Sequence, residues 1–373
     1  MSKRSVPSII LLGHLVNDTF SFMISGLLPV FTVLFNLSYL LLGVIVMVFN
    51  VTSSILQPLF GRWFDRSQAA WLLEMGLILN CIGMSLVGFS PNYVVLLFLI
   101  GTAGLGSAAF HPPAFSAVLR SSDSSKGSAM GLFVSGGNIG VFLGPIVAGS
   151  LVSLLGPRGT IVMLPIGLVT VVLLFRAHLQ KKVSSVEVTL SHPANLRLLV
   201  LLAAITAFRS ISIQSAVNFL PLYFVKLGDP LLIATAITST WLGFGVLGQL
   251  GGGFLSDRFG ERGVVVTSLL LGAFLFYGFL VTSSYLSLVL LAVSGALLYA
   301  SWASIVVMST EAAPNNVGAV SGFMLGFSVG IGGLAAVGFG AVGDVLGLSY
   351  AFYLVTASAL LGGIVALFLP RRI

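Results

Sequence analysis

The segment LLIATAITSTWLGFGVLGQLGGGFL (residues 231–255) runs for 25 residues without a charged side chain. About 20 apolar residues in an α-helix cross the hydrocarbon core of a bilayer. A strand of a membrane β-barrel needs only about 10 residues and alternates apolar with polar positions. Because the segment is long and uncharged throughout, we expect a transmembrane helix here.

The rest of the chain has the same character. Of its 373 residues, 57% are hydrophobic and 7% are charged, whereas a soluble protein carries about 25% charged residues. This composition excludes secreted, cytosolic and nucleic-acid-binding proteins, despite a formal net charge of +7. We predict an all-α integral membrane protein with twelve transmembrane helices in the runs 8–35, 39–59, 70–90, 92–118, 128–155, 159–178, 197–225, 231–255, 263–283, 285–311, 317–345 and 349–369.

Lysines and arginines are unevenly distributed between the two sides of these helices. With a cytoplasmic N-terminus, fourteen lie on the inner side, two (Arg158 and Lys226) on the outer side, and Arg209 within a span. Cytoplasmic loops of membrane proteins carry such an excess of basic residues. We expect a multi-pass monomer in the lipid bilayer of the plasma (inner) membrane, with both termini in the cytoplasm and no nucleic-acid partner.

The two halves of the chain repeat each other. Gly61-Arg-Trp-Phe-Asp-Arg66 follows the second run, and Gly253-Phe-Leu-Ser-Asp-Arg258 follows the eighth, 192 residues later. We predict two six-helix bundles in parallel orientation, residues 1–178 and 197–373, joined by a cytoplasmic linker at 179–196. Transporters built from parallel repeats bind substrate near the midplane between the halves, and rocking of the halves alternates access to the site.

Both hexapeptides resemble the loop signature of the major facilitator superfamily, G-x-L-a-D-R-x-G-R-R. The first copy has Trp63 in place of the leucine and no glycine after Arg66, whereas the second continues to Gly260 and Arg262. Because the signature occurs in the expected loop of both halves, the resemblance covers the whole chain. It implies the two-bundle transporter fold of that superfamily.

The fifth run resembles the antiporter motif of the drug–proton exporters, G-x-x-x-G-P-x-x-G-G. The matching residues are Gly140, Gly144, Pro145 and Gly149, with Ala148 in place of one glycine. This resemblance, rather than the glycines themselves, implies an antiporter driven by protons.

Three shorter stretches resemble the fosmidomycin-resistance subfamily. They are His14-Leu-Val-Asn-Asp18, Phe110-His-Pro112 running on to Arg120, and Gly136-Gly-Asn138. Pro113 departs from that subfamily, in which an acidic residue commonly follows the His-Pro pair. The resemblance implies export of a small organic molecule, drug-like or anionic, in exchange for protons.

Two charges lie deep within predicted spans, Asp18 in the first and Arg209 in the seventh. A charge at the centre of a membrane helix costs about 2.5–3.5 kcal/mol on insertion scales, which favours a functional role. The two residues are 191 positions apart and therefore equivalent in the two halves. In the superfamily fold both would line the central cavity and face each other. We expect Asp18 to carry the proton as this pair is made and broken; a permanent ion pair is the alternative.

Two histidines accompany these charges. His14 lies one helical turn before Asp18 on the same face, so it could relay protons or orient the carboxylate by a hydrogen bond. His111 precedes Pro112 and Pro113, which we expect to break the fourth helix. The His111 ring could contact substrate, or it could bond to carbonyl groups that the break sets free.

Charged residues near the repeated hexapeptides could link helix ends in one conformation only. The candidates for this conformational latch are Asp65, Arg66, Arg120, Asp257, Arg258 and Glu311. Their recurrence in both halves favours a latch over the alternative, a solvated basic loop.

Polar and aromatic residues inside the spans are candidates for the substrate cavity. They are Phe22, His111, Asn138, Gln214, Asn218, Trp241, Tyr299 and Trp302. Aromatic walls with few polar groups suit an amphiphilic organic molecule, although each side chain could instead serve in packing.

Glycines at intervals of four residues predict flat helix faces that pack closely against neighbours. They are Gly136, Gly140 and Gly144 in the fifth run and Gly318, Gly322, Gly326 and Gly330 in the eleventh.

Patterns for enzyme chemistry are lacking. The glycine patterns at 104–109 and 243–248 match dinucleotide-binding motifs only in composition, because both lie within spans without a preceding strand. We find no phosphate-binding loop, metal-ligand spacing or nucleophilic triad, and we expect neither a cofactor nor enzyme activity. Two alternatives to export stay open: a symporter or facilitator that imports a small organic metabolite, and a non-transporting receptor or scaffold.

Overall fold

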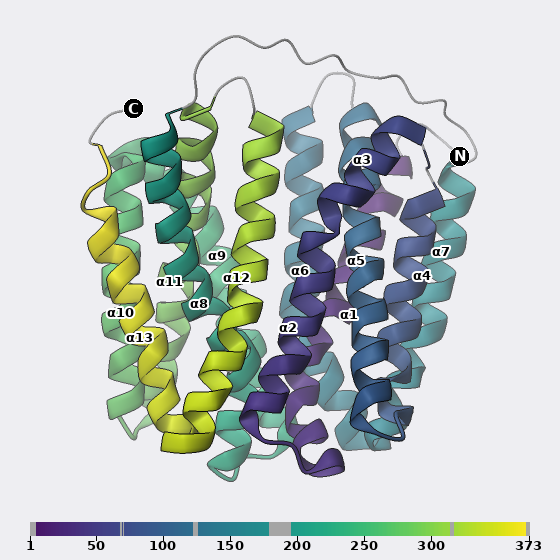
Figure 1. Cartoon of the computed structure of the whole chain (residues 1–373), viewed down its shortest axis with the longest axis horizontal. Coiled ribbons are helices and arrows are strands. Elements are labelled where there is room, and N and C mark those ends of the chain that lie inside the picture. Colours follow the sequence, from purple (N-terminus) through teal and green to yellow (C-terminus); the bar gives the residue numbers. More distant parts are fainter. Residues whose placement is uncertain are drawn as a thin grey trace. The chain divides into compact units, whose positions relative to one another are not determined.

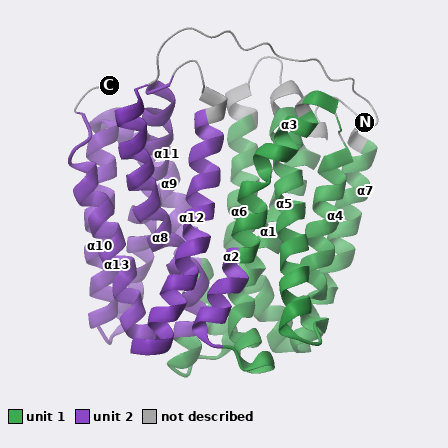
Figure 2. Cartoon of the chain, viewed as in Figure 1, with its two compact units in different colours: residues 1–37, 48–185, 224–239 green, residues 38–47, 186–223, 240–373 purple. Residues whose placement is uncertain are grey.

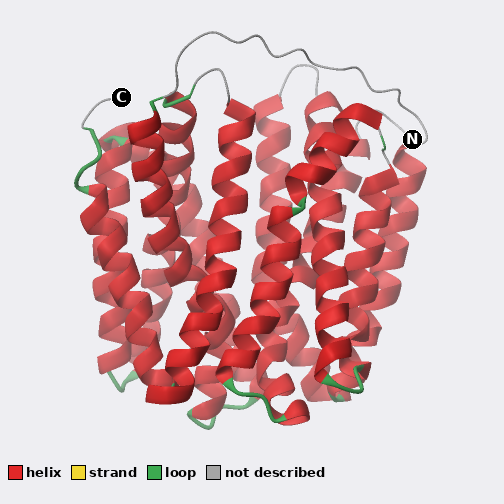
Figure 3. Cartoon of the chain, in the orientation of Figure 1, coloured by secondary structure: helices red, strands yellow, loops and turns green. Residues whose placement is uncertain are grey.

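The computed structural model describes residues 5–67, 69, 71–121, 126–178, 195–313 and 317–370. In this part of the chain all regular structure is helical and no strand occurs (Figure 3). The prediction of an all-α protein is confirmed.

Thirteen α-helices and two short 3-10 helices follow one another along the described residues (Figure 1). They are α1 (Ser5–Phe35), α2 (Tyr39–Ile55), α3 (Gln57–Ser67), α4 (Trp71–Leu86), η1 (Val87–Phe89), α5 (Tyr93–Ser121), α6 (Lys126–Leu155), η2 (Pro157–Met163), α7 (Leu164–His178), α8 (Leu196–Lys226), α9 (Leu231–Phe259), α10 (Glu261–Val281), α11 (Tyr285–Glu311), α12 (Val317–Leu346) and α13 (Leu348–Ala366).

Twelve stretches of the described helices are long and apolar enough to cross a membrane, which confirms the predicted number of spans. Three spans combine two helices each: α2 with α3, α4 with η1, and η2 with α7. The other nine spans are single α-helices.

The chain forms two compact units (Figure 2). Unit 1 consists of Met1–Leu37, Val48–Ser185 and Phe224–Ser239, and unit 2 consists of Ser38–Met47, Val186–Tyr223 and Thr240–Ile373. Most of each unit comes from one predicted bundle, but the first part of α2 belongs to unit 2 and the first part of α9 to unit 1. The bundle boundaries stay a prediction, and residues 179–194 of the predicted linker lie outside the described residues.

Hydrogen bonds connect the first part of α2 to unit 2 and the first part of α9 to unit 1. In unit 2, Asp344 of α12 accepts hydrogen bonds from the backbone N–H groups of Tyr39 (2.7 Å) and Leu40 (2.9 Å) at the start of α2. The first N–H groups of a helix have no partner within the helix, and a carboxylate satisfies them. In unit 1, the backbone N–H of Ile146 in α6 donates to the hydroxyl of Ser239 in α9 at 3.1 Å.

Glycines set the contact between α1 and α6 in unit 1. A Cβ at Gly136 would lie 2.9 Å from Cγ of Leu11, and a Cβ at Gly144 would lie 2.6 Å from Cβ of Phe22. Gly140 meets α1 just as closely, 3.0 Å from Cβ of Asp18. The predicted flat face of the fifth span is therefore confirmed.

The glycine ridge predicted for the eleventh span differs from the structure. A Cβ at Gly322 or Gly330 would meet no described atom within 4 Å. The close approaches on α12 lie further along, where a Cβ at Gly332 would lie 2.9 Å from Cβ of Gln214 and Gly340 packs against Tyr39. Spacing alone predicts a flat face but not which glycines a neighbour covers.

The repeated hexapeptides are helical, so their description as loops is wrong. The first lies in α3 and the second at the end of α9. In α3 the apolar side is covered, because Phe64 is buried with Ala69 and Leu72, while Arg62 and Arg66 are exposed. An amphipathic pattern of this kind favours a helix with one covered face over an open loop.

The predicted break at Pro112 and Pro113 is also wrong, because α5 is continuous from Tyr93 to Ser121. Membrane helices tolerate proline where neighbouring groups compensate for the lost backbone bonds. The ring of His111 bonds to a carbonyl one turn earlier in this helix, that of Ser107.

Candidate functional site

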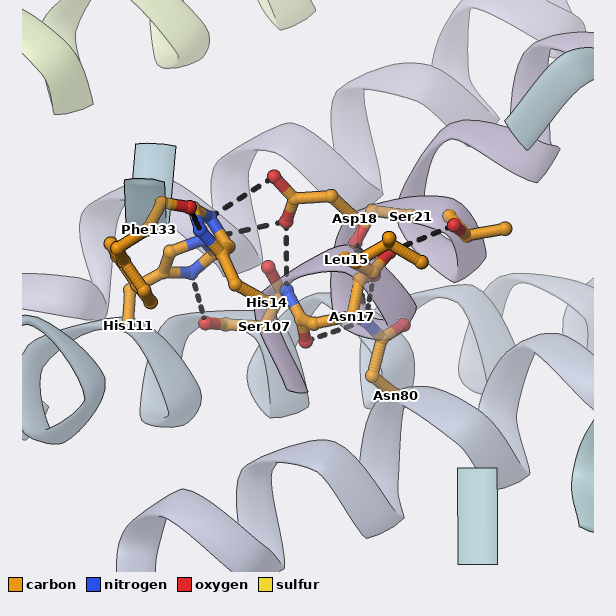
Figure 4. Close-up of polar contacts among 10 residues, drawn as sticks. His14, Leu15, Asn17, Asp18, Ser21, Asn80, Ser107, His111 and Phe133 are labelled. Carbon is orange, nitrogen blue, oxygen red and sulfur yellow. Dashed lines mark hydrogen bonds and ion pairs between the residues drawn. The ribbon is translucent and has the colours of Figure 1, made fainter. Parts of the chain in front are cut away.

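Asp18 lies in α1, and its carboxylate contacts two histidine rings (Figure 4). Oδ2 lies 3.2 Å from Nε2 of His14 on the same helix, and Oδ1 lies 3.5 Å from Nε2 of His111 in α5. The exposed fractions of the three side chains are 14% for Asp18, 8% for His14 and 18% for His111. We call these three residues the His–Asp–His cluster; all of them belong to unit 1.

The other nitrogen of each ring is bound to a backbone carbonyl. Nδ1 of His14 lies 2.8 Å from the carbonyl oxygen of Phe133, and Nδ1 of His111 lies 2.8 Å from that of Ser107. A carbonyl only accepts hydrogen bonds, so each Nδ1 carries a hydrogen and donates it. Nε2 is then the nitrogen that faces Asp18, and its protonation decides the charge of the ring.

The number of protons in the cluster controls both contacts with the carboxylate. Without a proton on Nε2 or on the carboxyl group, lone pairs face lone pairs at 3.2 and 3.5 Å. One proton converts one contact into a hydrogen bond, and a second proton converts the other. Hydrogen bonds between imidazolium and carboxylate are stronger than neutral ones. The cluster can therefore hold one or two exchangeable protons inside a span.

A buried amide network supports the carboxylate. Nδ2 of Asn17 donates to Oδ1 of Asp18 at 3.0 Å, and Nδ2 of Asn80 in α4 donates to Oδ1 of Asn17 at 2.9 Å. Both asparagines are fully buried. Breaking such a bond leaves a buried polar group unpaired, which costs about 1–3 kcal/mol, so the network holds the carboxylate in one orientation. Asn80 is not among the predicted site residues, because its only signal in the sequence is its position in an apolar run.

Glycine and aromatic neighbours enclose the cluster. A Cβ at Gly137 of α6 would lie 2.5 Å from Nε2 of His14 and 2.8 Å from Oδ2 of Asp18. The ring of Phe133 stacks on His14 with 4.0 Å between centroids. Gly137, which the sequence marked only as part of a subfamily-like stretch, therefore belongs to the site.

The same cluster could hold a divalent cation. One ligand atom from each of its three side chains lies within 4.8 Å of the others, and imidazole and carboxylate are suitable donors for transition metals. Sequence spacing does not predict such a group, because His111 is 93 residues from Asp18 and reaches it only in the folded chain.

Arg209 in α8 is 5% exposed, and its partners in unit 2 are neutral. Nε donates to the carbonyl oxygen of Leu298 at 3.2 Å and to Oγ of Ser301 at 3.0 Å, both in α11. The guanidinium carbon lies 5.6 Å from the ring centroid of Tyr299 and 5.1 Å from that of Trp302. Dipoles and aromatic faces thus partly compensate for the charge.

The predicted pairing of Asp18 with Arg209 joins residues of different units and stays a prediction. Within its own unit, each charge has partners that the sequence did not reveal. They are a second histidine for the carboxylate and two aromatic rings for the guanidinium.

Two cavity candidates are fully or largely buried in unit 2. Trp241 is completely enclosed, with its Nε1 donating to Oγ of Ser294 at 3.4 Å and its ring 5.8 Å from that of Tyr299. Asn218 donates to the carbonyl oxygen of Gln214 at 2.8 Å. These contacts are packing contacts, and a role in substrate binding stays a prediction.

Phe22, Asn138 and Gln214 are half-buried, as are Tyr299 and Trp302. Partial exposure leaves these side chains open to a ligand. Their assignment to the substrate cavity also stays a prediction.

The latch candidates are unpaired as far as they are described. Four are exposed and form no ion pair with another described residue: Arg66, Asp257, Arg258 and Glu311. The side chains of Asp65 and Arg120 lie outside the described part of the chain, although the backbone of both is helical. The latch stays a prediction.

The second part of the antiporter-like motif in α6 packs on two neighbours. A Cβ at Gly26 of α1 would lie 2.6 Å from the carbonyl oxygen of Pro145, and Gly149 packs against the side chain of Thr235 in α9. The motif therefore has a packing role in unit 1.

In sequence comparisons, one family matches nearly the whole chain. The sequence profile of the Major Facilitator Superfamily matches residues 10–235 and 202–373. An uncharacterised MFS-type transporter of Bacillus subtilis (strain 168), YfnC, is 27% identical over 98% of this chain and 93% of its own length. The fosmidomycin resistance protein of Escherichia coli (strain K12) is 27% identical over 96% of this chain and 91% of its own length.

Solved structures agree with this fold. A bacterial homologue of the human lysosomal transporter Spinster, in an inward-facing and occupied conformation, has a TM-score of 0.87 at 15% identity, with 98% of this chain and 97% of that chain covered. A variant of the nucleoside transporter NupG has a TM-score of 0.76 at 14% identity, with 96% and 98% covered. At such low identity these similarities concern the fold alone.

Proposed function

We propose that this chain, which belongs to the major facilitator superfamily, exports a small organic molecule in exchange for protons by alternating access. Membership of this family makes it a multi-pass membrane transporter and not an enzyme. Proton coupling, the outward direction and the class of substrate are the proposed elements. The observation that carries proton coupling is the His–Asp–His cluster inside a span. The direction and the substrate class rest on the similarity to the fosmidomycin resistance protein.

Proton coupling needs a group whose proton occupancy changes as its surroundings change. In our scheme the cluster fills with protons when it is open to the compartment with the higher proton concentration, and it empties when rocking opens it to the other. The carbonyl bonds at Nδ1 hold both rings in place during this exchange. Only the Nε2 atoms of His14 and His111 and the carboxyl group of Asp18 then change their protonation.

Similarity to the fosmidomycin resistance protein supports export and a drug-like or anionic substrate. The antiporter-like motif of α6 supports the same direction. We assign the protein to the plasma membrane, where export removes a compound from the cell. In this scheme the latch residues bind one another in one state only, and the cavity candidates contact the substrate.

The test uses purified protein in liposomes that enclose a pH-sensitive dye. Fosmidomycin is added under an imposed pH gradient, and wild type is compared with Asp18→Asn. Asp229→Asn is the matched control, because Asp229 lies between α8 and α9, outside the cluster. We expect wild type and the control to move protons against the flow of substrate and Asp18→Asn to move none. Substrate exchange without a gradient, retained in Asp18→Asn, would demonstrate that the variant is folded.

Other outcomes contradict parts of the proposal. Unchanged proton flux in Asp18→Asn would remove Asp18 from the mechanism. Protons and substrate moving in the same direction would indicate a symporter, and exchange without protons a facilitator. If a chelator abolished transport by wild type, the cluster would bind a metal ion instead of carrying protons. A stable complex with a partner protein, without transport of any compound, would indicate a receptor or scaffold.

A further inference from the structure

Arg209 has hydrogen-bond donors that no described residue of the protein accepts. A guanidinium group carries five N–H bonds. The Nε–H is shared between the carbonyl of Leu298 and the hydroxyl of Ser301. The N–H groups of the two Nη atoms form no hydrogen bond with any described residue. Neither Nη atom is among the fully enclosed polar atoms without a partner, so both keep accessible surface.

The positive charge of Arg209 also lacks a counter-charge within its unit. The residue is 5% exposed, and no described acidic group of unit 2 lies within 4.0 Å of it. A buried charge is costly unless it is paired as well as hydrogen-bonded. Carbonyl, hydroxyl and ring partners satisfy part of the guanidinium but do not neutralise it. A group that neutralises Arg209 would therefore have to be an anion.

The free edge of the guanidinium determines which anion fits. The edge that contains Nε is occupied by α11. The edge formed by the two Nη atoms remains, and it offers two parallel N–H bonds. Carboxylate, phosphate and phosphonate groups present two oxygens that accept such a pair. A halide or another monatomic anion would use only part of this geometry.

The aromatic neighbours hold the guanidinium and leave an apolar wall beside it. The guanidinium carbon lies 5.6 Å from the ring centroid of Tyr299 and 5.1 Å from that of Trp302. Tyr299 is itself fixed, because its ring lies 5.8 Å from that of Trp241 and a Cβ at Gly245 would lie 2.7 Å from its Cδ2. Rings placed in this way exclude bulk water, which strengthens a charge-assisted hydrogen bond.

We propose that Arg209, Tyr299 and Trp302 form a subsite for an oxyanion group, a carboxylate or a phosphorus oxyacid, of the transported organic molecule. The two Nη atoms of Arg209 bind the oxyanion, and the two rings contact the organic part next to it. This assignment rests on the proposed function only in taking the ligand to be the transported molecule.

The test measures equilibrium binding to the full-length protein in detergent by isothermal titration calorimetry. The probes are two acids, phenylphosphonate and benzoate, their neutral esters, diethyl phenylphosphonate and methyl benzoate, and inorganic phosphate. The variants are Arg209→Gln, Arg209→Lys and Asp18→Asn. Arg158→Gln is the matched control, because Arg158 also lies over a ring, that of Phe89 at 5.5 Å, but is exposed and belongs to unit 1.

We expect at least one acid to bind wild type, with its ester weaker by about tenfold or more. Arg209→Gln should weaken the acid by about tenfold while leaving ester affinity and melting temperature unchanged, which separates lost binding from misfolding. Arg209→Lys keeps the charge without the parallel pair of donors and should lie in between. Arg158→Gln should match wild type. The better acid identifies the oxyanion as carboxylate or phosphonate.

Four results would overturn the assignment. They are equal affinity for acid and ester, acid affinity that survives Arg209→Gln, no binding of either acid at millimolar concentration, and acid binding that appears only in Asp18→Asn. The last would make Asp18 the counter-charge of Arg209. Inorganic phosphate that binds as tightly as phenylphosphonate would replace the organic ligand with a free anion. Binding at equilibrium needs no pH gradient, so a failure of proton coupling and a failure of this subsite are distinguishable.

Discussion

Asp18 and Arg209 occupy corresponding positions in the two sequence repeats, but their surroundings differ in kind. Asp18 lies against two imidazole rings that can take up and release protons. Arg209 lies against a carbonyl, a hydroxyl and two aromatic faces, and its Nη donors form no hydrogen bond with the described residues. Both corresponding positions therefore carry a charge, but the charges have opposite signs and different partners. In our proposals the two units therefore bind different ligands: unit 1 binds protons, and unit 2 binds the anionic group of the substrate.

The largest effects are expected when proton flux and phenylphosphonate affinity are both measured on Asp18→Asn and on Arg209→Gln. Asp18→Asn should reduce proton flux to the rate of protein-free liposomes, because an amide that does not ionise replaces the carboxyl group whose two oxygens face the two rings. Its affinity for phenylphosphonate should stay at the wild-type value. Arg209→Gln should lose that affinity. The dye assay and calorimetry on the same preparations measure both properties. If each variant lost both of them, the two sites would not be separable and the comparison would fail.

A methyl group tests the cluster without removing any of its ionisable groups. In Gly137→Ala the new Cβ would lie 2.5 Å from Nε2 of His14 and 2.8 Å from Oδ2 of Asp18, so the ring and the carboxylate must separate. Overpacking of this kind costs about 1–3 kcal/mol, and we expect proton flux to fall about tenfold. Gly131→Ala on the same helix is the control, because its Cβ would meet no described atom within 4 Å. Equal initial rates of proton flux in Gly137→Ala and Gly131→Ala would contradict the geometry of the cluster.

The corresponding test in unit 2 is Gly245→Ala in α9. The added Cβ would lie 2.7 Å from Cδ2 of Tyr299 and displace that ring from Arg209. A cation–π contact contributes about 0.5–2 kcal/mol, so phenylphosphonate affinity should fall about threefold to tenfold, as measured by calorimetry. Gly251→Ala, whose Cβ would meet no described atom within 4 Å, should leave it unchanged. An unaltered affinity in Gly245→Ala would remove Tyr299 from the subsite.

Much of the fold follows from the sequence, because membrane spans depend on local composition. Apolar runs of about 20 residues predict the spans without knowledge of any distant contact. The errors concern local detail at helix ends and prolines. The hexapeptide at 61–66 is helical because Phe64 buries its side chain, and Pro112 is accommodated within a continuous α5. Both outcomes depend on neighbours that a sequence window does not contain.

The candidate site was only partly predictable for the same reason. The contact between His14 and Asp18 follows from their spacing of four residues in one helix. His111 and Asn80 join the same site from α5 and α4, and no local pattern gives their distance from Asp18. The aromatic setting of Arg209 likewise requires α11 to pack against α8. The sequence predicts that Asp18 and Arg209 lie within spans, but it does not predict which side chains contact them there.

The smallest expected effect concerns Asp344, a charged residue near the C-terminal end of α12. Asp344 is exposed and accepts hydrogen bonds from the N–H groups of Tyr39 and Leu40, so it caps α2. Removing a cap of this kind costs about 0.5–2 kcal/mol. We expect Asp344→Ala to lower the free energy of unfolding by about 1 kcal/mol in a urea titration, with Asp229→Asn unchanged. Proton flux and phenylphosphonate affinity should persist, because Asp344 contacts neither Arg209 nor the cluster. Were Asp344→Ala to abolish either activity while the protein stayed folded, that activity would depend on the attachment of α2 to α12, and the contrast between Asp18 and Arg209 would not suffice to explain it.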